Sequence, residues 1–350
     1  MMLRTLIGLL CAGGLVARAQ MPKLARVEDA PATWMGAMVR NVVGTGLVGQ
    51  TGVMVMEAPV GSAASRFGLR RDDVILSVNG GAVEGFAALT SLSGTPERVK
   101  ISRGQAEVTL SLWQGFARSD SDFGGRVLTI VAPAKTAEGK PWLWRGEFFG
   151  AFATVDEALL KVGWHVVYLA CPNTFGSPET MERWEKLYEE LTGQRGFSKR
   201  PVLLGMSRGG LYVYNWAAAH PDKVGLIYGD APVCDVKSWP GGKGKGKGSP
   251  RDWDLFQKVY GFDERQAMAW RGNPIDILPP IAAARIPVIH VVGEADDVVP
   301  VDENTSVLKE RYEALGGKME VIGKPGVGHH PHSLEDPTPI VKFILENRLN

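Results

Sequence analysis

The sequence predicts an α/β protein in two parts: a small β-rich domain, followed by a doubly wound, mostly parallel sheet. Two observations predict this fold class. Before residue 115 the chain consists of short apolar runs separated by glycine turns, which indicates strands and hairpins. From Arg126 onward, apolar runs alternate with segments of helical periodicity, a pattern typical of a parallel sheet with helices on both faces. The 350 residues are enough for two domains.

The composition is that of a soluble globular protein, with 45% hydrophobic and 22% charged residues. The formal net charge is only +1. Nucleic acids and anionic membranes attract strongly basic proteins, so this balance supports neither as a partner. We therefore expect no nucleic-acid partner and no membrane partner.

Residues 1–19 predict an export signal. Arg4 precedes an apolar run over 6–16, and Ala17-Arg18-Ala19 has the small-x-small pattern that signal peptidase cuts. The apolar run is too short to span a bilayer. We therefore expect a mature protein in the periplasm or outside the cell.

Export bears on the two cysteines that follow the signal, Cys171 and Cys234. Both come after predicted strands, so the ends that carry them could lie close together. In an oxidising compartment two thiols often pair. The sequence leaves open whether these two form a disulfide or stay as buried thiols.

Residues 30–114 contain the motif GSAASRFGLRRDDVILSVNG, in which Gly68 ends a short helix and a strand stops at Asn79-Gly80. The motif resembles the PDZ family, in the circular permutation found in bacterial exported proteases. That resemblance implies a groove in which the C-terminus of an extended peptide adds as a strand, with its carboxylate held by backbone N–H groups. The matching loop here is Met35, Gly36 and Ala37. Whether this domain docks peptides or is purely structural stays open.

Two polar stretches are expected to lack regular structure. Residues 115–125 are polar and contain glycines, so we expect a linker before the second domain, 126–350. Residues 239–250, WPGGKGKGKGSP, alternate glycine and lysine. Such a run cannot build a core and predicts a mobile loop.

The most informative motif is Gly205-Met206-Ser207-Arg208-Gly209, which fits Gly-x-Ser-x-Gly. It follows the strand-like PVLL and precedes the helix-like GGLYVYNWAAAHP, the context that this motif requires. A sharp turn there would expose the Ser207 hydroxyl as a nucleophile. The backbone N–H of Arg208, at the helix start, would face a developing oxyanion.

A serine nucleophile needs a base, and the base needs an acid to orient it. The later segments HVVGEADDVVP and GKPGVGHHPHS supply them in the order Ser, Asp, His. This order resembles the α/β-hydrolase superfamily. In that family Gly-x-x-Asp matches Asp296, with Asp297 as the alternative acid. Gly-x-Gly-His matches His329, with His330 as the alternative base; His332 is a further rival, and we expect no metal site among these histidines.

The loop APAKTAEGKPWLWRGEFFG, after the first strand of the second domain, should supply the other oxyanion donor. We expect the backbone N–H of Trp144 or Arg145 to serve. Trp142 and Trp144 offer flat faces for stacking on sugar rings, although packing in the core explains them equally well. Arg208 keeps its charge and could grip a substrate carboxylate with two hydrogen bonds.

The arginine after the nucleophile partly resembles glucuronoyl esterases, whose motif is Gly-Cys-Ser-Arg-x-Gly. Together GKPWLWR, GMSRGGLYVYNWA and GVGHHPHSLEDPTPI look more like exported bacterial α/β-hydrolases, some of which are carbohydrate esterases. We therefore expect a secreted, cofactor-independent serine esterase acting on acetyl or methyl esters of plant-type polysaccharides. The alternatives are a serine peptidase of the prolyl-oligopeptidase type and an inactive peptide-binding protein.

Overall fold

The structure is a computed structural model that describes residues 31–42, 51–92, 96–104 and 106–349. The expected export signal, 1–19, lies outside the described residues. The strands are β1 Ala32–Trp34, β2 Ala37–Val42, β3 Gly52–Glu57, β4 Val74–Val78, β5 Gly81–Ala82, β6 Arg98–Arg103, β7 Ala106–Trp113, β8 Phe116–Phe123, β9 Arg126–Ala132, β10 Trp142–Arg145, β11 His165–Leu169, β12 Val202–Met206, β13 Leu226–Asp230, β14 Val288–Gly293 and β15 Met319–Lys324.

The helices are mostly short, and most of them lie after β9 in the chain. They are α1 Ala63–Arg66, α2 Phe86–Thr90, α3 Thr154–Lys161, α4 Pro178–Glu189 with the π-helical turn η1 Glu190–Gln194, α5 Gly209–Ala219, the 3-10 turns η2 Pro221–Lys223 and η3 Pro274–Asp276, α6 Pro250–Tyr260, α7 Glu264–Ala269, α8 Pro279–Ala283, α9 Thr305–Ala314 and α10 Thr338–Asn347.

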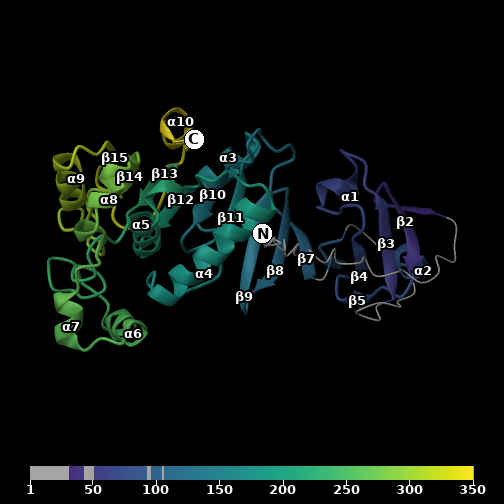
Figure 1. Ribbon diagram of the computed structural model, residues 1–350, viewed down its shortest axis with the longest axis horizontal. Helices are drawn as coiled ribbons and strands as arrows, with labels where there is room; N and C mark the ends of the chain where they lie inside the picture. The colour runs from purple at the N-terminus through teal and green to yellow at the C-terminus, as the bar shows by residue number, and fades with distance from the viewer. Residues whose placement is uncertain (1–30, 43–50, 93–95, 105, 350) are drawn as a thin grey trace, which may run out of the picture.

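The described strands form one sheet, in the order β1-β2-β3-β4-β6-β7-β8-β9-β11-β10-β12-β13-β14-β15, with β5 paired to β4 (Figure 1). Strands β1 to β9 pair antiparallel throughout. Strand β9 is also antiparallel to β11, and from β11 to β15 every pair is parallel. The prediction of a mixed α/β fold with a large sheet is confirmed.

The expected linker is wrong. Residues 116–123 form strand β8, which pairs with β7 on one side and β9 on the other. Its polar side chains find partners within the sheet: Thr129 Oγ1 donates to Asp120 at 2.6 Å, and Arg118 forms an ion pair with Asp120 at 2.9 Å. Because β8 continues the ladder, the two expected domains share one sheet.

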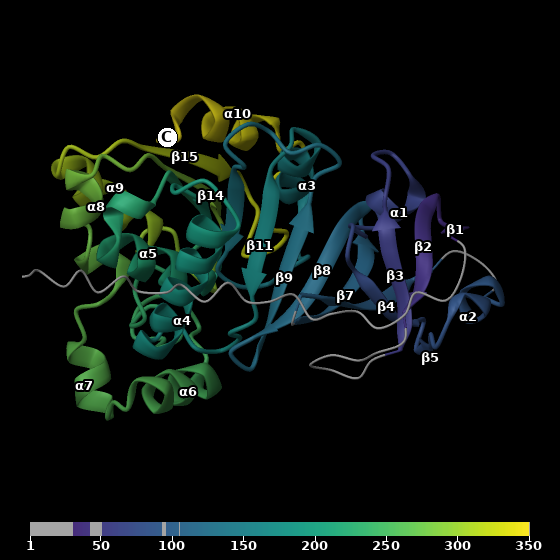
Figure 2. The same ribbon diagram turned by 45° about the vertical axis from the view of Figure 1, so that its right-hand side comes forward.

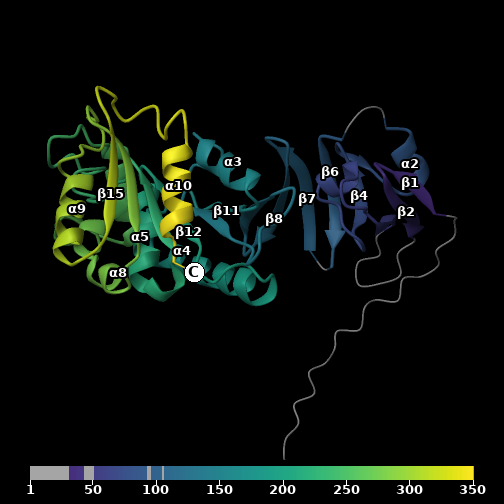
Figure 3. The ribbon, with the colours of Figure 1, turned by 90° about the horizontal axis from the view of Figure 1, so that it is seen from above.

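Helices cover both faces of the parallel half (Figure 3). Helices α3 and α10 pack on one face around a core that includes Leu143, Leu159 and Ile340. On the other face α4, α5, α8 and α9 enclose a larger core rich in tryptophan. Doubly wound sheets place their sites beyond the carboxyl ends of the strands, which is where the Ser207 turn follows β12.

The excursion between β13 and β14 leaves the sheet and forms α6 and α7, seen at the lower left of Figure 2. Its glycine–lysine segment contacts acidic residues, and the expected mobility of this loop stays a prediction. Lys247 pairs with Asp297, and Lys245 pairs with Asp302. The segment therefore rests on the loop that follows β14. None of the helices in the described ranges is long and apolar enough to cross a membrane.

In the N-terminal part, Met35 and Gly36 form the two-residue turn of a hairpin, with φ of +52° and +75°. The turn joins β1 to β2, and Ala37 is buried as the first residue of β2. Strand β1 pairs with one edge of β2 and β3 with the other. The edge that a docked peptide would need is therefore already paired within the chain, and peptide docking at Met35, Gly36 and Ala37 stays a prediction.

Candidate active site

Ser207 lies at a sharp turn between β12 and α5. Its φ is +48°, a left-handed conformation that a non-glycine residue adopts only under restraint. The restraint comes from β13 and the residues that follow it: the Ser207 N–H donates to the Asp230 carbonyl at 2.9 Å, and the Val233 N–H donates to the Ser207 carbonyl at 2.8 Å. The turn is thus fixed at the ends of two neighbouring parallel strands.

The glycines around Ser207 are required by close packing. A Cβ on Gly205 would lie 2.6 Å from Cγ2 of Val213, and one on Gly210 would lie 2.7 Å from the Val233 carbonyl. Contacts that short do not occur between a Cβ and its neighbours, so larger residues would displace the turn.

The structure brings Ser207, His329 and Asp296 into one hydrogen-bonded row. Ser207 Oγ lies 3.0 Å from His329 Nε2, and His329 Nδ1 lies 2.7 Å from Asp296 Oδ2. Because a carboxylate only accepts, Nδ1 carries the proton and Nε2 is left to accept from the serine. Asp296 is itself fixed, since its Oδ1 accepts from the N–H groups of Val298 and Val299 at 2.9 and 2.8 Å.

The geometry distinguishes the alternatives that the sequence left open. Asp297 points to solvent and pairs with Lys247, which lowers the pKa of its carboxyl group. His330 is exposed and packs against Phe152, with ring centroids 5.9 Å apart. Neither residue takes part in the hydrogen-bonded row at Ser207.

Asp230, at the end of β13, is a further residue of the site that sequence reasoning missed. It is buried, and its carboxylate accepts from the Ser333 N–H at 2.7 Å and pairs with His332 Nδ1 at 3.1 Å. These bonds hold the loop that carries His329. The available signal was a carboxylate at the end of a fully buried strand, in YGD.

The expected oxyanion donors Trp144 and Arg145 are wrong. Both are within β10, paired in parallel with β11 and β12, so their backbone groups belong to the sheet. The chain leaves the sheet two residues later, at Glu147. Its backbone N approaches the nucleophile turn, since a Cβ placed on Gly209 would lie 3.6 Å from it. The N–H groups of Glu147 and Arg208 have no acceptor among the described residues.

Trp142 and Trp144 do not line the site either; both are completely buried. Trp144 stacks on Trp184 with ring centroids 4.1 Å apart, and Trp142 Nε1 donates to the Ser198 carbonyl at 2.9 Å. Helices cover both faces of the sheet at β10, so all four side chains of WLWR are buried. Phe152 is an accessible aromatic residue, 40% exposed and beside the histidine loop.

The Arg145 side chain holds the loop 146–152, which carries Glu147. Its buried guanidinium donates to the carbonyls of Phe148 and Ala151 at 2.9 and 3.0 Å. Asp156 lies 3.4 Å from its Nε, and burial raises the pKa of that carboxyl group. Arg145 therefore fixes the loop 146–152 through these two hydrogen bonds.

Arg208 is not free to grip a substrate carboxylate, which corrects the expectation. Its Nε and Nη2 both contact the carboxylate of Glu147 at 2.9 Å, and its Nη1 lies 3.7 Å from Asp252. Burial raises the pKa of Glu147, and the guanidinium opposes that shift. Two carboxylates thus surround one guanidinium beside the nucleophile.

Cys171 and Cys234 are free, buried thiols, so the disulfide that the sequence left open is not formed. They follow β11 and β13, which are three strand spacings apart in the sheet. That separation is about 14 Å, and a disulfide needs Cα atoms within about 7 Å. Burial raises the pKa of both thiols, which favours their protonated form.

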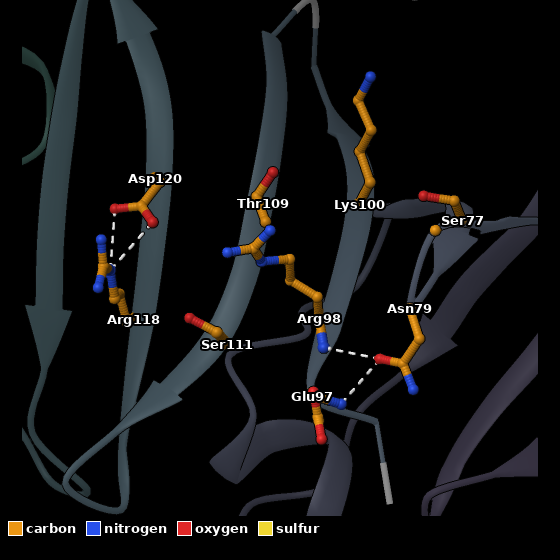
Figure 4. Close-up of a pocket in the computed structure, with 10 residues that line it drawn as sticks. Ser77, Asn79, Glu97, Arg98, Lys100, Thr109, Ser111, Arg118 and Asp120 are labelled. Carbon is orange, nitrogen blue, oxygen red and sulfur yellow. Dashed lines mark hydrogen bonds and ion pairs between the residues drawn. The ribbon is translucent and has the colours of Figure 1, made fainter. Parts of the chain in front are cut away.

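A cavity of about 690 Å³ lies apart from this row, on the antiparallel half of the sheet (Figure 4). Its wall includes Asn79, Arg98, Arg118 and Asp120. The Asn79 side chain accepts from the backbone N–H of Arg98, and Arg118 faces Asp120. None of the predicted site residues Ser207, Asp296 and His329 lines this cavity.

No protein-family model matches the sequence, and no curated protein matches it. Solved structures do. The chain is similar to Est1E from Butyrivibrio proteoclasticus, with 20% identity and a TM-score of 0.49 over 66% of this chain and 98% of that chain. It is similar to the Pyrococcus horikoshii acylaminoacyl peptidase, with 11% identity and a TM-score of 0.51 over 95% of this chain and 57% of that chain.

A third similar structure is a Mycobacterium tuberculosis puromycin-hydrolyzing peptidase, with 13% identity and a TM-score of 0.51 over 88% of this chain and 52% of that chain. The chain thus spans just over half the length of these two peptidases. The similar structures include proteins named as lipases, as peptidases and as a carbohydrate esterase. At these identities the likeness concerns the fold, so activity must be argued from the site.

Proposed function

We propose that this chain is a serine hydrolase that cleaves carboxylic esters through an acyl-enzyme. One observation carries the proposal: Ser207 Oγ, His329 and Asp296 lie in a continuous row with separations of 3.0 and 2.7 Å. That is the arrangement in which an imidazole takes the serine proton while a carboxylate stabilises the resulting cation.

The reaction would proceed in two halves. Ser207 Oγ attacks the ester carbonyl as its proton passes to His329 Nε2, and the N–H groups of Arg208 and Glu147 stabilise the oxyanion. His329 then protonates the departing alcohol, leaving an acyl-serine. Water, deprotonated by His329, attacks the acyl carbon, and the proton returns to Ser207 as the carboxylic acid leaves.

An uncharged ester suits the surroundings of the nucleophile. Glu147 and Asp252 surround Arg208, so an anionic group finds no unpaired cation there. A methyl-esterified uronate or an acetylated sugar is neutral at its ester, and the exposed ring of Phe152 offers an apolar face for a sugar ring. We therefore propose acetyl or methyl esters of polysaccharides as substrates, met after export directed by residues 1–19.

Turnover of p-nitrophenyl acetate tests the chemistry. The wild-type protein should hydrolyse it, and Ser207→Ala should lose at least about 10³-fold in kcat. Ser119→Ala is a matched control, because that hydroxyl lies in β8 and contacts only the Ile130 carbonyl. Equal turnover in wild type and Ser207→Ala would show that this site is not the catalyst.

A second measurement identifies the substrate class. Methanol release from pectin and acetate release from acetylated xylan would support the polysaccharide ester. Cleavage of peptides without ester hydrolysis would instead support the peptidase. The described strands form one continuous sheet, whereas the propeller of prolyl-oligopeptidase-type peptidases consists of several separate four-stranded sheets around an axis.

A further inference from the structure

Three imidazoles meet in the loop between β15 and α10: those of His329, His330 and His332. One ring nitrogen of each lies within 4.8 Å of one ring nitrogen of the other two. Their ring centroids are 4.7 to 5.0 Å apart, and each pair is close to perpendicular, with interplanar angles of 73° to 84°. The ester reaction described above uses only His329 as its base; His332 helps to hold the loop through Asp230, and no role in the reaction has been given to His330.

Two of the rings have a carboxylate partner on Nδ1, as metal-bound histidines commonly do. His329 Nδ1 faces the buried carboxylate of Asp296 at 2.7 Å, and His332 Nδ1 faces that of Asp230 at 3.1 Å. A carboxylate that accepts from Nδ1 leaves the lone pair on Nε2 available. Metal-bound histidines in proteins commonly donate their other N–H to a carboxylate in this way, which fixes the ring and makes it a stronger ligand.

The third ring, His330, provides access from solvent, because it is exposed while the other two are buried. The three rings therefore reach from the buried carboxylates to the surface.

Contrary to the expectation from the sequence, we propose that His329, His330 and His332 form a binding site for a divalent transition-metal ion of the Zn²⁺ type, and that its occupancy switches off Ser207. Imidazole suits Zn²⁺, which takes nitrogen at about 2.0–2.1 Å. Three imidazoles leave one position for water. The inhibitory part rests on the proposed function, because Nε2 of His329 cannot bind a metal and accept the Ser207 proton at once.

Calorimetry tests the binding directly, on tag-free protein first treated with EDTA and dialysed. Zn²⁺ should bind at one site, and Mg²⁺, which prefers oxygen ligands, should not. His330→Gln should weaken Zn²⁺ binding by at least about tenfold, on the scale known for altered metal sites. His220→Gln is the matched control: it removes a partly exposed histidine at the far end of α5, paired with Glu185, and should leave the affinity unchanged.

Zn²⁺ binding that is absent, or that is equal in wild type and His330→Gln, would overturn the site. Zn²⁺ should also inhibit p-nitrophenyl acetate turnover, EDTA should restore it, and the inhibiting concentration should rise at least about tenfold in His330→Gln relative to that variant's own metal-free rate. Turnover that persists with the site saturated would overturn the inhibition. A protein that binds Zn²⁺ but never turns over ester would refute the proposed function and leave the site standing.

Discussion

Asp230 joins the nucleophile turn to the histidine loop: its carbonyl accepts from the Ser207 N–H at 2.9 Å, while its carboxylate accepts from the Ser333 N–H at 2.7 Å. These two segments are more than a hundred residues apart in the chain. A single residue at the end of β13 therefore sets the register between the serine and the imidazole that serves it.

The first prediction concerns this tether. Asp230→Asn keeps one oxygen but must present an N–H where the carboxylate now accepts, so the histidine loop should shift. A misplacement of about 1 Å can cost about 100-fold, and we expect a loss of that order in kcat with KM little changed. Asp222→Asn, an exposed aspartate in η2, is the control. Wild-type kcat in Asp230→Asn would mean that His329 is positioned without it.

The two adjacent aspartates should respond differently. Asp296→Asn should lower kcat by about 10⁴-fold, because an amide at this position favours the wrong tautomer of His329. Asp297→Asn should keep near-wild-type kcat, since its carboxylate faces Lys247 instead. Steady-state kinetics on the two variants decide the matter, and the reverse ranking would reassign the acid to Asp297.

The Glu147–Arg208 ion pair should contribute to the stability of the fold rather than to the binding of a charged substrate. Their side chains are only 3% and 14% exposed. Glu147→Gln leaves the guanidinium with only the more distant Asp252, and breaking such a pair costs about 3–5 kcal/mol. Urea unfolding measures the loss. The double variant Glu147→Gln/Arg208→Gln should regain part of it, and a double variant no more stable than Glu147→Gln would argue against the pair.

Two buried histidines should make the fold sensitive to acid. Burial lowers the pKa of His165 to about 4 and that of His290 to about 3, so both stay neutral in the folded chain while the unfolded chain protonates them below pH 6.5. The unfolded state then binds more protons, and stability falls as the pH falls from 6.5 toward 4. Each group contributes about 1.4 kcal/mol per pH unit.

Urea unfolding between pH 7 and pH 4.5 measures that slope. His165→Gln removes one titrating group and should make the slope shallower by about 1.4 kcal/mol per pH unit. An unchanged slope would mean that His165 charges within the folded protein.

The sequence predicted the parts of this fold that depend on local pattern. The Gly205–Gly209 motif predicted a turn between a strand and a helix, and that is where Ser207 lies. The order of serine, acid and histidine predicted which segments would meet. Asp296 and Asp297 could not be told apart in this way, because neighbouring residues differ in which direction they face, and only the packed loop determines that.

The errors share a physical cause, which is pairing that the local sequence does not reveal. Residues 116–123 look like a linker because they are polar, yet backbone pairing with β7 and β9 makes them a strand. Trp142 and Trp144 look like a sugar platform because the sequence does not show that β10 lies between β11 and β12. Glu147 was missed as an oxyanion donor because the end of β10 is set by its pairing with β11 and β12. The local sequence does not reveal where that pairing stops.

The ladder through β8 also limits how the molecule can move. Since β7, β8 and β9 are joined by backbone hydrogen bonds, a hinge motion of the N-terminal strands between them would have to break those bonds. A shortened chain that begins at β8 would lack β7 and would leave one edge of β8 unpaired. Unpaired strand edges bind other chains and promote aggregation. The N-terminal strands thus cover the edge that the sheet would otherwise expose at β8.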